Sequence, residues 1–280
     1  FDVESLELNP SFARDVFKVL YEELVPRREV RQKLGIYTTP DWLAELVLDK
    51  LGLTVENMLK EGEGDWRKPL QKRVLDPGVG TGTFLVLYIQ RLGEYLRRRF
   101  GGAISPEIAR EALHLITQNV VGFDIDALAL LTARANYLIA LASIGILQYK
   151  GGKDIEIPVY LANSVTPAGY SEESRVIKDQ VVPTVVVDTS AGTFVVPRLA
   201  AEKMKQAMEE LRKLLDREVP KQHAIDRLRQ FLGEAEAVAM ADFYDRLLRL
   251  KKEGRDSIWI SVVESYIMPA IHTNTFDYVV

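Results

Sequence analysis

The stretch VLDPGVGTGTFL at residues 74–85 decides the fold class of this chain. Val74 and Leu75 are the apolar residues of a short buried strand, and DPGVGTG at 76–82 is a glycine-rich turn. An apolar helix is expected from about Thr83. Glycines at alternate positions remove the β-carbons that would keep a ligand away from the backbone, and they let the chain turn sharply into the helix. The stretch therefore predicts a strand, a ligand-binding turn and a helix.

The alternation of strands and helices continues after this stretch. The predicted elements are a helix over 106–117, a strand over Val120–Phe123 that ends at Asp124, a helix over about 127–147, and a strand over 157–161 that ends at Asn163. Such alternation is typical of a parallel sheet with helices on its faces. Ligands bind at the carboxyl ends of the strands in such sheets, so we expect the glycine turn and Asp124 at one edge of an α/β fold.

Asp124 is a candidate ligand residue, because a carboxylate at the end of a strand can accept hydrogen bonds from both hydroxyls of a ribose. Two other nucleotide-binding patterns fail on spacing. A phosphate-binding P-loop needs a lysine after its last glycine, and none follows Gly82. The dinucleotide fingerprint places its acidic residue about 20 residues further on, whereas Asp124 lies 42 positions beyond Gly82. Two plainer interpretations stay open: a purely structural turn, and Asp124 as a cap of the helix that begins at Ala127.

The segment before residue 74 is predicted to be helical first and polar later. Its first apolar residues recur at helical spacing: Phe12, Val16, Val19, Leu20 and Leu24. A basic cluster follows at 27–33. A second helix is expected after YTTP at 37–40, with Thr39 as its N-cap and Pro40 at its first position. Residues 53–72 are polar and contain glycine, which predicts a loop.

The pattern changes after Ser164. The sequence predicts a small hairpin over 184–196 and two or three amphipathic helices over 198–252, then a helix over 257–271 and a strand FDYVV at 276–280. The expected domains are an N-terminal helical arm (1–34), an α/β core (35–166), an insertion (167–256) and a return to the core (257–280).

The composition excludes several classes of protein. Of 280 residues, 47% are hydrophobic and 27% charged, and the net charge of -4 argues against a uniformly basic surface for nucleic acid, although basic clusters at 27–33 and 97–99 allow a local one. The absence of cysteine excludes disulfides and thiolate metal sites, and the three histidines are isolated, so no metal is expected. No apolar run reaches the length of a membrane span, about 18 residues, and a signal-peptide pattern is missing. A cytoplasmic location is expected.

Several motifs together resemble N6-adenine-specific DNA methyltransferases of the class whose cofactor motifs precede the catalytic motif. DPGVGTGTFL at 76–85 is similar to that family's loop for S-adenosylmethionine (AdoMet), commonly DPACGSGxFL. GIYTTP at 35–40 is similar to the GxYYTP element, and GFDID at 122–126 to the ribose-binding strand end, which is followed by a helix with an asparagine, here Asn136. LYEEL at 20–24 adds a similarity to restriction-modification and phage-defence methylases.

The resemblance implies a Rossmann-like AdoMet-dependent methyltransferase sheet with an N-terminal helical arm and a mostly helical insertion. The family's cofactor-binding positions fall on Tyr37, Thr38, Thr39, Pro40, Asp76, Gly78, Gly80, Phe84, Asp124, Ile125 and Asn163. In that family the element at 37–40 would contact the methionine end of AdoMet, and the loop from Asp76 to Gly80, with Phe84 nearby, would form the wall beside its amino group and sulfonium.

The adenosine end of AdoMet would be held by the ends of the next two strands. Asp124 would bind the ribose hydroxyls, and Ile125 would pack on the adenine ring. Asn163 stands where the family often has an aspartate at the adenine amino group, and its side-chain oxygen can still accept a hydrogen bond. Val79 replaces the usual cysteine of the loop, which suits an apolar packing position.

The family's catalytic element, Asn/Asp-Pro-Pro-Tyr/Phe/Trp, follows a strand of the type FDxVV with one glycine between them. FDYVV at 276–280 resembles that strand, and no Asn-Pro-Pro or Asp-Pro-Pro occurs in the chain. The expectation is the AdoMet-binding part of a DNA adenine-N6 methyltransferase from a restriction-modification or related defence system. This part would end just before the catalytic motif, contain no catalytic residue and be inactive alone.

The expected cofactor is AdoMet. The expected partners are double-stranded DNA, through the full-length protein, and restriction or specificity subunits, with no membrane. Two alternatives stay open: methylation of RNA or protein on the same cofactor fold, and a non-catalytic AdoMet-binding or assembly module.

Overall fold

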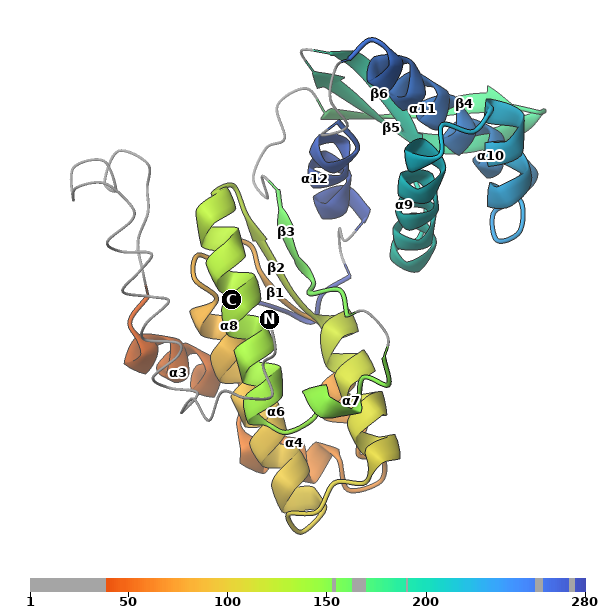
Figure 1. Cartoon of the computed structure of the whole chain (residues 1–280). Coiled ribbons are helices and arrows are strands. Elements are labelled where there is room, and N and C mark those ends of the chain that lie inside the picture. The colour runs from red at the N-terminus through yellow and green to blue at the C-terminus, as the bar shows by residue number, and fades with distance from the viewer. Residues whose placement is uncertain (1–38, 153–154, 163–169, 190, 255–258, 272–274) are drawn as a thin grey trace, which may run out of the picture. The chain divides into compact units, whose positions relative to one another are not determined.

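The computed structural model describes residues 39–152, 155–162, 170–189, 191–254, 259–271 and 275–280. They belong to two compact units (Figure 1): Phe1–Leu161 with Thr275–Val280, and Ala162–Asn274. The predicted helix over 12–24 and the basic cluster at 27–33 lie outside the described residues.

The first unit contains, in its described residues, a four-stranded parallel sheet. Its strands are β1 (Val74–Asp76), β2 (Val120–Asp124), β3 (Val159–Leu161) and β7 (Tyr278–Val279). Their order is β3-β2-β1-β7, and every neighbouring pair is parallel. Asp76 lies beside Gly122 in the register, so β2 extends two residues further than β1, to Asp124. The turn after β1 and the end of β2 therefore share one edge of the sheet.

Helices connect these strands. They are α6 (Thr83–Arg99) and α7 (Pro106–Asn119) between β1 and β2, and α8 (Ala127–Ser143) with the 3-10 turn η2 (Leu147–Tyr149) between β2 and β3. Helices α6 and α8 pack against each other and against β2 (Figure 1). The start of α7 is encoded locally, because the Ser105 hydroxyl accepts a hydrogen bond from the Ile108 N–H at 3.4 Å and Pro106 takes the first helical position. The prediction of an α/β structure with a parallel sheet is confirmed. This architecture is compatible with a methyltransferase fold, and its Rossmann-like arrangement stays a prediction.

Helix α3 (Asp41–Lys50) follows Pro40, as predicted, but its predicted cap is wrong. Pro40 is itself the N-cap, and its carbonyl accepts hydrogen bonds from the N–H groups of Leu43 and Ala44 at 3.0 and 3.1 Å. Thr39 therefore lies one residue outside the helix.

The prediction of a loop over 53–72 is also wrong. The segment contains α4 (Val55–Glu61) and α5 (Lys68–Gln71). The Thr54 hydroxyl caps α4 by accepting the Asn57 N–H at 3.3 Å. Each helix buries apolar side chains, among them Met58 and Leu70, and α4 packs on α6. Helices this short show too few turns for a hydrophobic period to stand out in a polar sequence.

The second unit contains a three-stranded antiparallel sheet and four helices in its described residues. They are β4 (Tyr170–Ile177), β5 (Gln180–Thr189), β6 (Gly192–Pro197), α9 (Ala201–Asp216), α10 (Lys221–Leu228), α11 (Glu234–Lys252) and α12 (Trp259–Ile271). The predicted hairpin is the β5–β6 pair, and the predicted amphipathic helices are α9 to α11. Strand β4 was not expected. It joins β5 through a two-residue turn, Lys178 and Asp179, whose φ angles are 51° and 60°.

Helix α12 packs on α9 and β5, and it belongs by its contacts to the second unit. An aromatic cluster ties these elements together. Phe194 of β6 lies edge-on to Phe243 of α11, with ring centroids 5.9 Å apart, and stacks on Trp259 of α12 at 6.2 Å. The expected division into a core and an insertion over 167–256 stays a prediction.

Candidate functional site

The glycine turn between β1 and α6 has a defined shape that depends on its glycines. Gly80 and Gly82 have φ angles of 51° and 90°, a region that residues with a β-carbon rarely adopt. The Val79 N–H donates to the Phe123 carbonyl at 2.8 Å, which ties the turn to β2. Gly122 makes this close approach possible, because a β-carbon there would lie 2.8 Å from Val79 Cγ2. The turn is thus held against the end of β2 by a backbone hydrogen bond and by packing.

Asp76 ends β1 and is buried at the base of this turn. The residue is 4% exposed, and its Oδ1 accepts the Gly78 N–H at 3.1 Å. Burial and the nearby charge of Asp124 raise the pKa of Asp76 to about 7, although the hydrogen bond from Gly78 acts in the opposite direction. Asp76 is therefore protonated in a large fraction of molecules near neutral pH.

Asp124 connects β2 to the glycine turn. One carboxylate oxygen, Oδ2, accepts the Gly80 N–H at 2.7 Å, and the other, Oδ1, accepts the Asp126 N–H at 2.8 Å. The cap of α8 is a different residue, Asp126, whose side chain accepts the Leu128 N–H at 2.9 Å. A carboxylate offers about four acceptor positions. Asp124 therefore keeps an acceptor position on each oxygen after its two backbone contacts.

A cavity of about 40 Å³ opens beside the turn. It is lined by Thr39, Asp76, Gly78, Val79, Gly80, Thr81, Thr83 and Phe84. Thr39 thus reaches the turn from a position far upstream in the sequence. The space above Gly78 is open, because a β-carbon built there would have no atom within 4 Å. A ligand can therefore approach the backbone at Gly78, and the small cavity holds only one end of a nucleotide-sized molecule.

Helix α8 supports the turn from behind. Asn136 is 2% exposed, and its Nδ2 donates to the Thr81 carbonyl at 2.9 Å. A β-carbon at Gly82 would lie 3.4 Å from the Cα and Cβ atoms of Ala133. The position of α8 therefore helps to fix the shape of the glycine turn.

Some of the residues predicted for the site lie close together in the structure. Thr39, Asp76, Gly78, Gly80 and Phe84 line the cavity, and Asp124 contacts it through Gly80. Ile125 is 69% exposed next to Asp124, and Pro40 is exposed at the start of α3.

Some of the predicted residues cannot be placed, and others were not predicted. Tyr37, Thr38 and Asn163 lie outside the described residues. Thr81 and Thr83 line the cavity but were not predicted as site residues. Their positions, among the glycines and directly after them, could have indicated this role.

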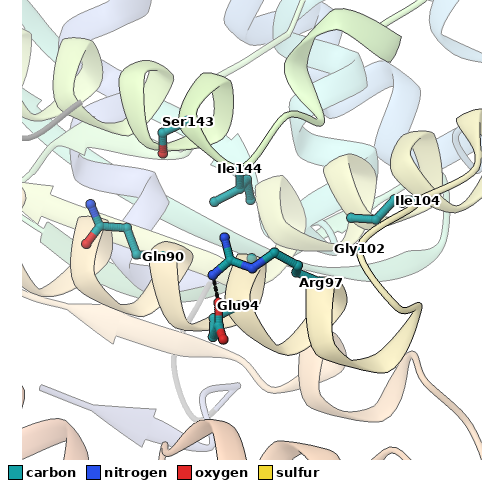
Figure 2. Close-up of a pocket in the computed structure, with 8 residues that line it drawn as sticks. Gln90, Glu94, Arg97, Gly102, Ile104, Ser143 and Ile144 are labelled. Atoms are coloured by element: carbon teal, nitrogen blue, oxygen red, sulfur yellow. Dashed lines mark ion pairs between the residues drawn. The ribbon is translucent and has the colours of Figure 1, made fainter. Parts of the chain in front are cut away.

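A larger cavity, of about 300 Å³, lies near the other ends of α6 and α8 (Figure 2). Its lining includes Gln90, Gly93, Ser143 and Ile144. The two charged residues among its lining, Glu94 and Arg97, form an ion pair with each other. Glu94 lies twelve positions after Gly82, which corresponds to about 18 Å along the axis of α6. The glycine turn, where no described lining residue places a positive charge beside the Asp76 carboxyl group, is the better candidate site.

Other candidate sites are weaker. In the part of the chain that the structure describes, no group of three or more His, Cys, Asp or Glu side chains is placed to hold a metal ion. His114 and His223 lie on α7 and α10, and His272 is outside the described residues. The same described part contains no helix long and apolar enough to cross a membrane.

Comparisons with known proteins find a distant relative of this chain. No protein-family model matches this chain, and no solved structure matches it. The relative is a protein of Methanocaldococcus jannaschii named "Putative type II restriction enzyme and methyltransferase RM.MjaORFECS2P". The two sequences are 26% identical over an alignment 317 positions long, which covers 94% of this chain and 25% of that protein. This chain therefore spans about a quarter of the length of its relative.

Proposed function

We propose that this chain binds AdoMet and forms the cofactor-binding part of a DNA adenine-N6 methyltransferase in a restriction-modification system. The name of the Methanocaldococcus jannaschii relative supports a methyltransferase of such a system. The target base and the cofactor are supported by the motifs at 35–40, 76–85 and 122–126. Double-stranded DNA and restriction or specificity subunits would be the partners of the whole protein.

The observation that carries the proposal is the arrangement of Asp124. Its two oxygens are oriented by the N–H groups of Gly80 and Asp126, and each keeps room for one more hydrogen bond. Two free acceptor positions on a fixed carboxylate suit the adjacent hydroxyls of a ribose. The exposed Ile125 side chain beside it offers an apolar surface for an adenine ring.

The chemistry around the glycine turn suits the other end of AdoMet, which carries an ammonium, a carboxylate and a sulfonium group. Asp76 can meet a positive group in the cavity. The first N–H groups of α6, which begins at Thr83, have no acceptor within the helix and favour a carboxylate. AdoMet when bound would supply the methyl group for transfer.

The order of the strands supports the same place for the ligand. β1 has β2 on one side and β7 on the other, so the direction in which successive strands are added reverses at β1. In open α/β sheets, ligands bind outside the carboxyl ends of the strands at such a reversal. The glycine turn after β1 lies at this position.

We further propose that these 280 residues do not transfer a methyl group on their own. No Asn-Pro-Pro or Asp-Pro-Pro occurs in the chain, and in the family that it resembles this element orients the amine of the target base. A base flipped out of the duplex needs such contacts to offset a few kcal/mol of unstacking. Transfer of labelled methyl groups to mixed-sequence DNA tests this proposal. Robust labelling of adenine by this chain alone would contradict it.

Calorimetric titration of the folded chain with AdoMet tests the proposed function directly. Asp124→Ala should weaken binding at least tenfold, because two hydrogen bonds to a charged acceptor, about 1.5–3 kcal/mol each, are lost. Asp126→Asn is the matched control, since it removes a neighbouring charge but keeps a good N-cap for α8. Asp124→Asn retains one acceptor oxygen and the side-chain volume, which separates loss of charge from loss of loop structure. Equal affinity of Asp124→Ala and the unmodified chain would refute the assignment.

A further inference from the structure

The cavity beside the glycine turn contains a buried carboxyl group. Asp76 is 4% exposed and lines this cavity. None of the described residues that line it carries a positive charge. The charged neighbour that acts on Asp76 is Asp124, at the end of the adjacent strand, and its charge is negative.

An ionised carboxylate in such a place is unfavourable. Burial removes water from the charge, and the like charge of Asp124 repels it. Among the described residues, it is the Gly78 N–H, at 3.1 Å, that stabilises the charge on Asp76. Without a ligand, Asp76 therefore retains its proton at a pH at which an exposed aspartate has lost it. The charge of the Asp76 carboxyl group therefore depends on whether a positively charged ligand occupies the cavity.

We propose that Asp76 is the residue that selects a positively charged cofactor, and that it does so by releasing its proton to solvent when the cation enters. This inference rests on the proposed function, because AdoMet is the cation. Before binding, the proton sits on the Asp76 carboxyl group. After binding, the carboxylate faces the positive charge of the ligand and the proton is in bulk water, so no other reactant is needed.

Two properties of binding follow from this exchange of a proton for a cation. With the pKa of Asp76 at about 7, AdoMet binding should release about nine-tenths of a proton at pH 6 and about one-tenth at pH 8. The affinity should fall about tenfold for each pH unit below 7, or about 30-fold from pH 8 to pH 5.5. Asp124→Asn should move this dependence to lower pH, because it removes the repelling charge.

The experiment is isothermal titration of the full chain with AdoMet between pH 5.5 and 8, in pairs of buffers with different ionisation enthalpies. Asp76→Asn is the control for titration of the ligand itself, since any dependence that comes from the AdoMet amino group persists in this variant. We expect proton release and a falling affinity at acidic pH in the unmodified chain, and neither between pH 5.5 and 7 in Asp76→Asn.

The outcomes separate this inference from the proposed function. AdoMet binding with the same proton release and pH dependence in both proteins overturns the inference and leaves the function standing. No AdoMet binding at any pH, by a folded sample, overturns both. If Asp76→Asn does not fold, proton release by the unmodified chain in the two buffers decides the question alone.

Discussion

Gly122→Ala tests whether the glycine turn is held in place by its close approach to β2. A β-carbon at Gly122 would lie 2.8 Å from Val79 Cγ2 and 3.0 Å from Leu85 Cδ1, whereas ordinary contacts begin at 3.4 Å. Val79 would have to move by about 0.6 Å to reach such a contact. It cannot do so freely, because it is 3% exposed, its N–H is bonded to the Phe123 carbonyl, and a β-branched side chain has few alternative rotamers.

Overpacking of this kind destabilises a core by about 1–3 kcal/mol, and we expect that loss for Gly122→Ala in urea unfolding followed by circular dichroism. A displaced Val79 also moves Gly80, whose N–H orients Asp124. AdoMet affinity, measured on the folded fraction, should therefore fall about tenfold, which corresponds to about 1.4 kcal/mol.

Gly64→Ala is the matched control for this substitution. Gly64 is exposed, and a β-carbon there would meet no atom within 4 Å. Its stability should stay within about 0.5 kcal/mol of the unmodified chain, with unchanged AdoMet affinity. The reasoning is refuted if Gly122→Ala behaves like Gly64→Ala in both measurements, because the turn would then adapt without loss.

The remaining predictions concern stability and its separation from binding. The pKa of Asp76 is about 7 in the folded chain and about 3.9 in an unfolded chain. The protonated carboxyl group therefore contributes stability that is complete below pH 4 and is lost as the pH rises to 7. Without ligand, the free energy of unfolding of Asp76→Asn should exceed that of the unmodified chain by up to about 4 kcal/mol at pH 8 and by little at pH 4. Thermal unfolding across that range checks it, and an equal difference at both pH values would contradict it. Asn136→Leu leaves the Thr81 carbonyl without its donor, so urea unfolding should show a loss of about 1–3 kcal/mol, and weaker AdoMet binding should accompany it. Gly93→Ala places a β-carbon 2.2 Å from Ile144 Cγ2 and should lower the free energy of unfolding by about 1–3 kcal/mol. The AdoMet affinity of the folded molecules should stay normal. A matching loss of affinity would show that the far ends of α6 and α8 are coupled to the site.

Several local structures could be predicted from the sequence because their signals are local. The strand, glycine turn and helix over 74–99 follow from apolar residues on either side of the glycines. Ser105 and Pro106 mark the start of α7, and the paired apolar stretches around 190–192 indicate the β5–β6 hairpin. In the helices and the hairpin the hydrogen bonds join residues close together in the chain, whereas β1 was indicated by its own apolar residues, although its partners β2 and β7 lie far away in the sequence.

Elements without such a local signal were missed. Strand β4 carries polar residues on both faces, and its turn uses Lys178 and Asp179 where a glycine would have marked a left-handed conformation. Helix α5 has four residues, too few for a helical period to appear. These elements are stabilised by the elements on which they pair or pack, so their own sequences do not reveal them.

The sequence by itself determined which residue types surround the site, and the tertiary structure decided what each of them does. Sequence left Asp124 open between a cap and a ligand residue; the fold gives the cap to Asp126 and turns Asp124 toward Gly80, 44 positions earlier in the chain. It also brings Thr39 to the glycine turn and Asn136 to the Thr81 carbonyl. The physical reason is that parallel strands end at one edge whatever their separation in sequence, so the environment that raises the pKa of Asp76 exists only once β1 and β2 are packed side by side.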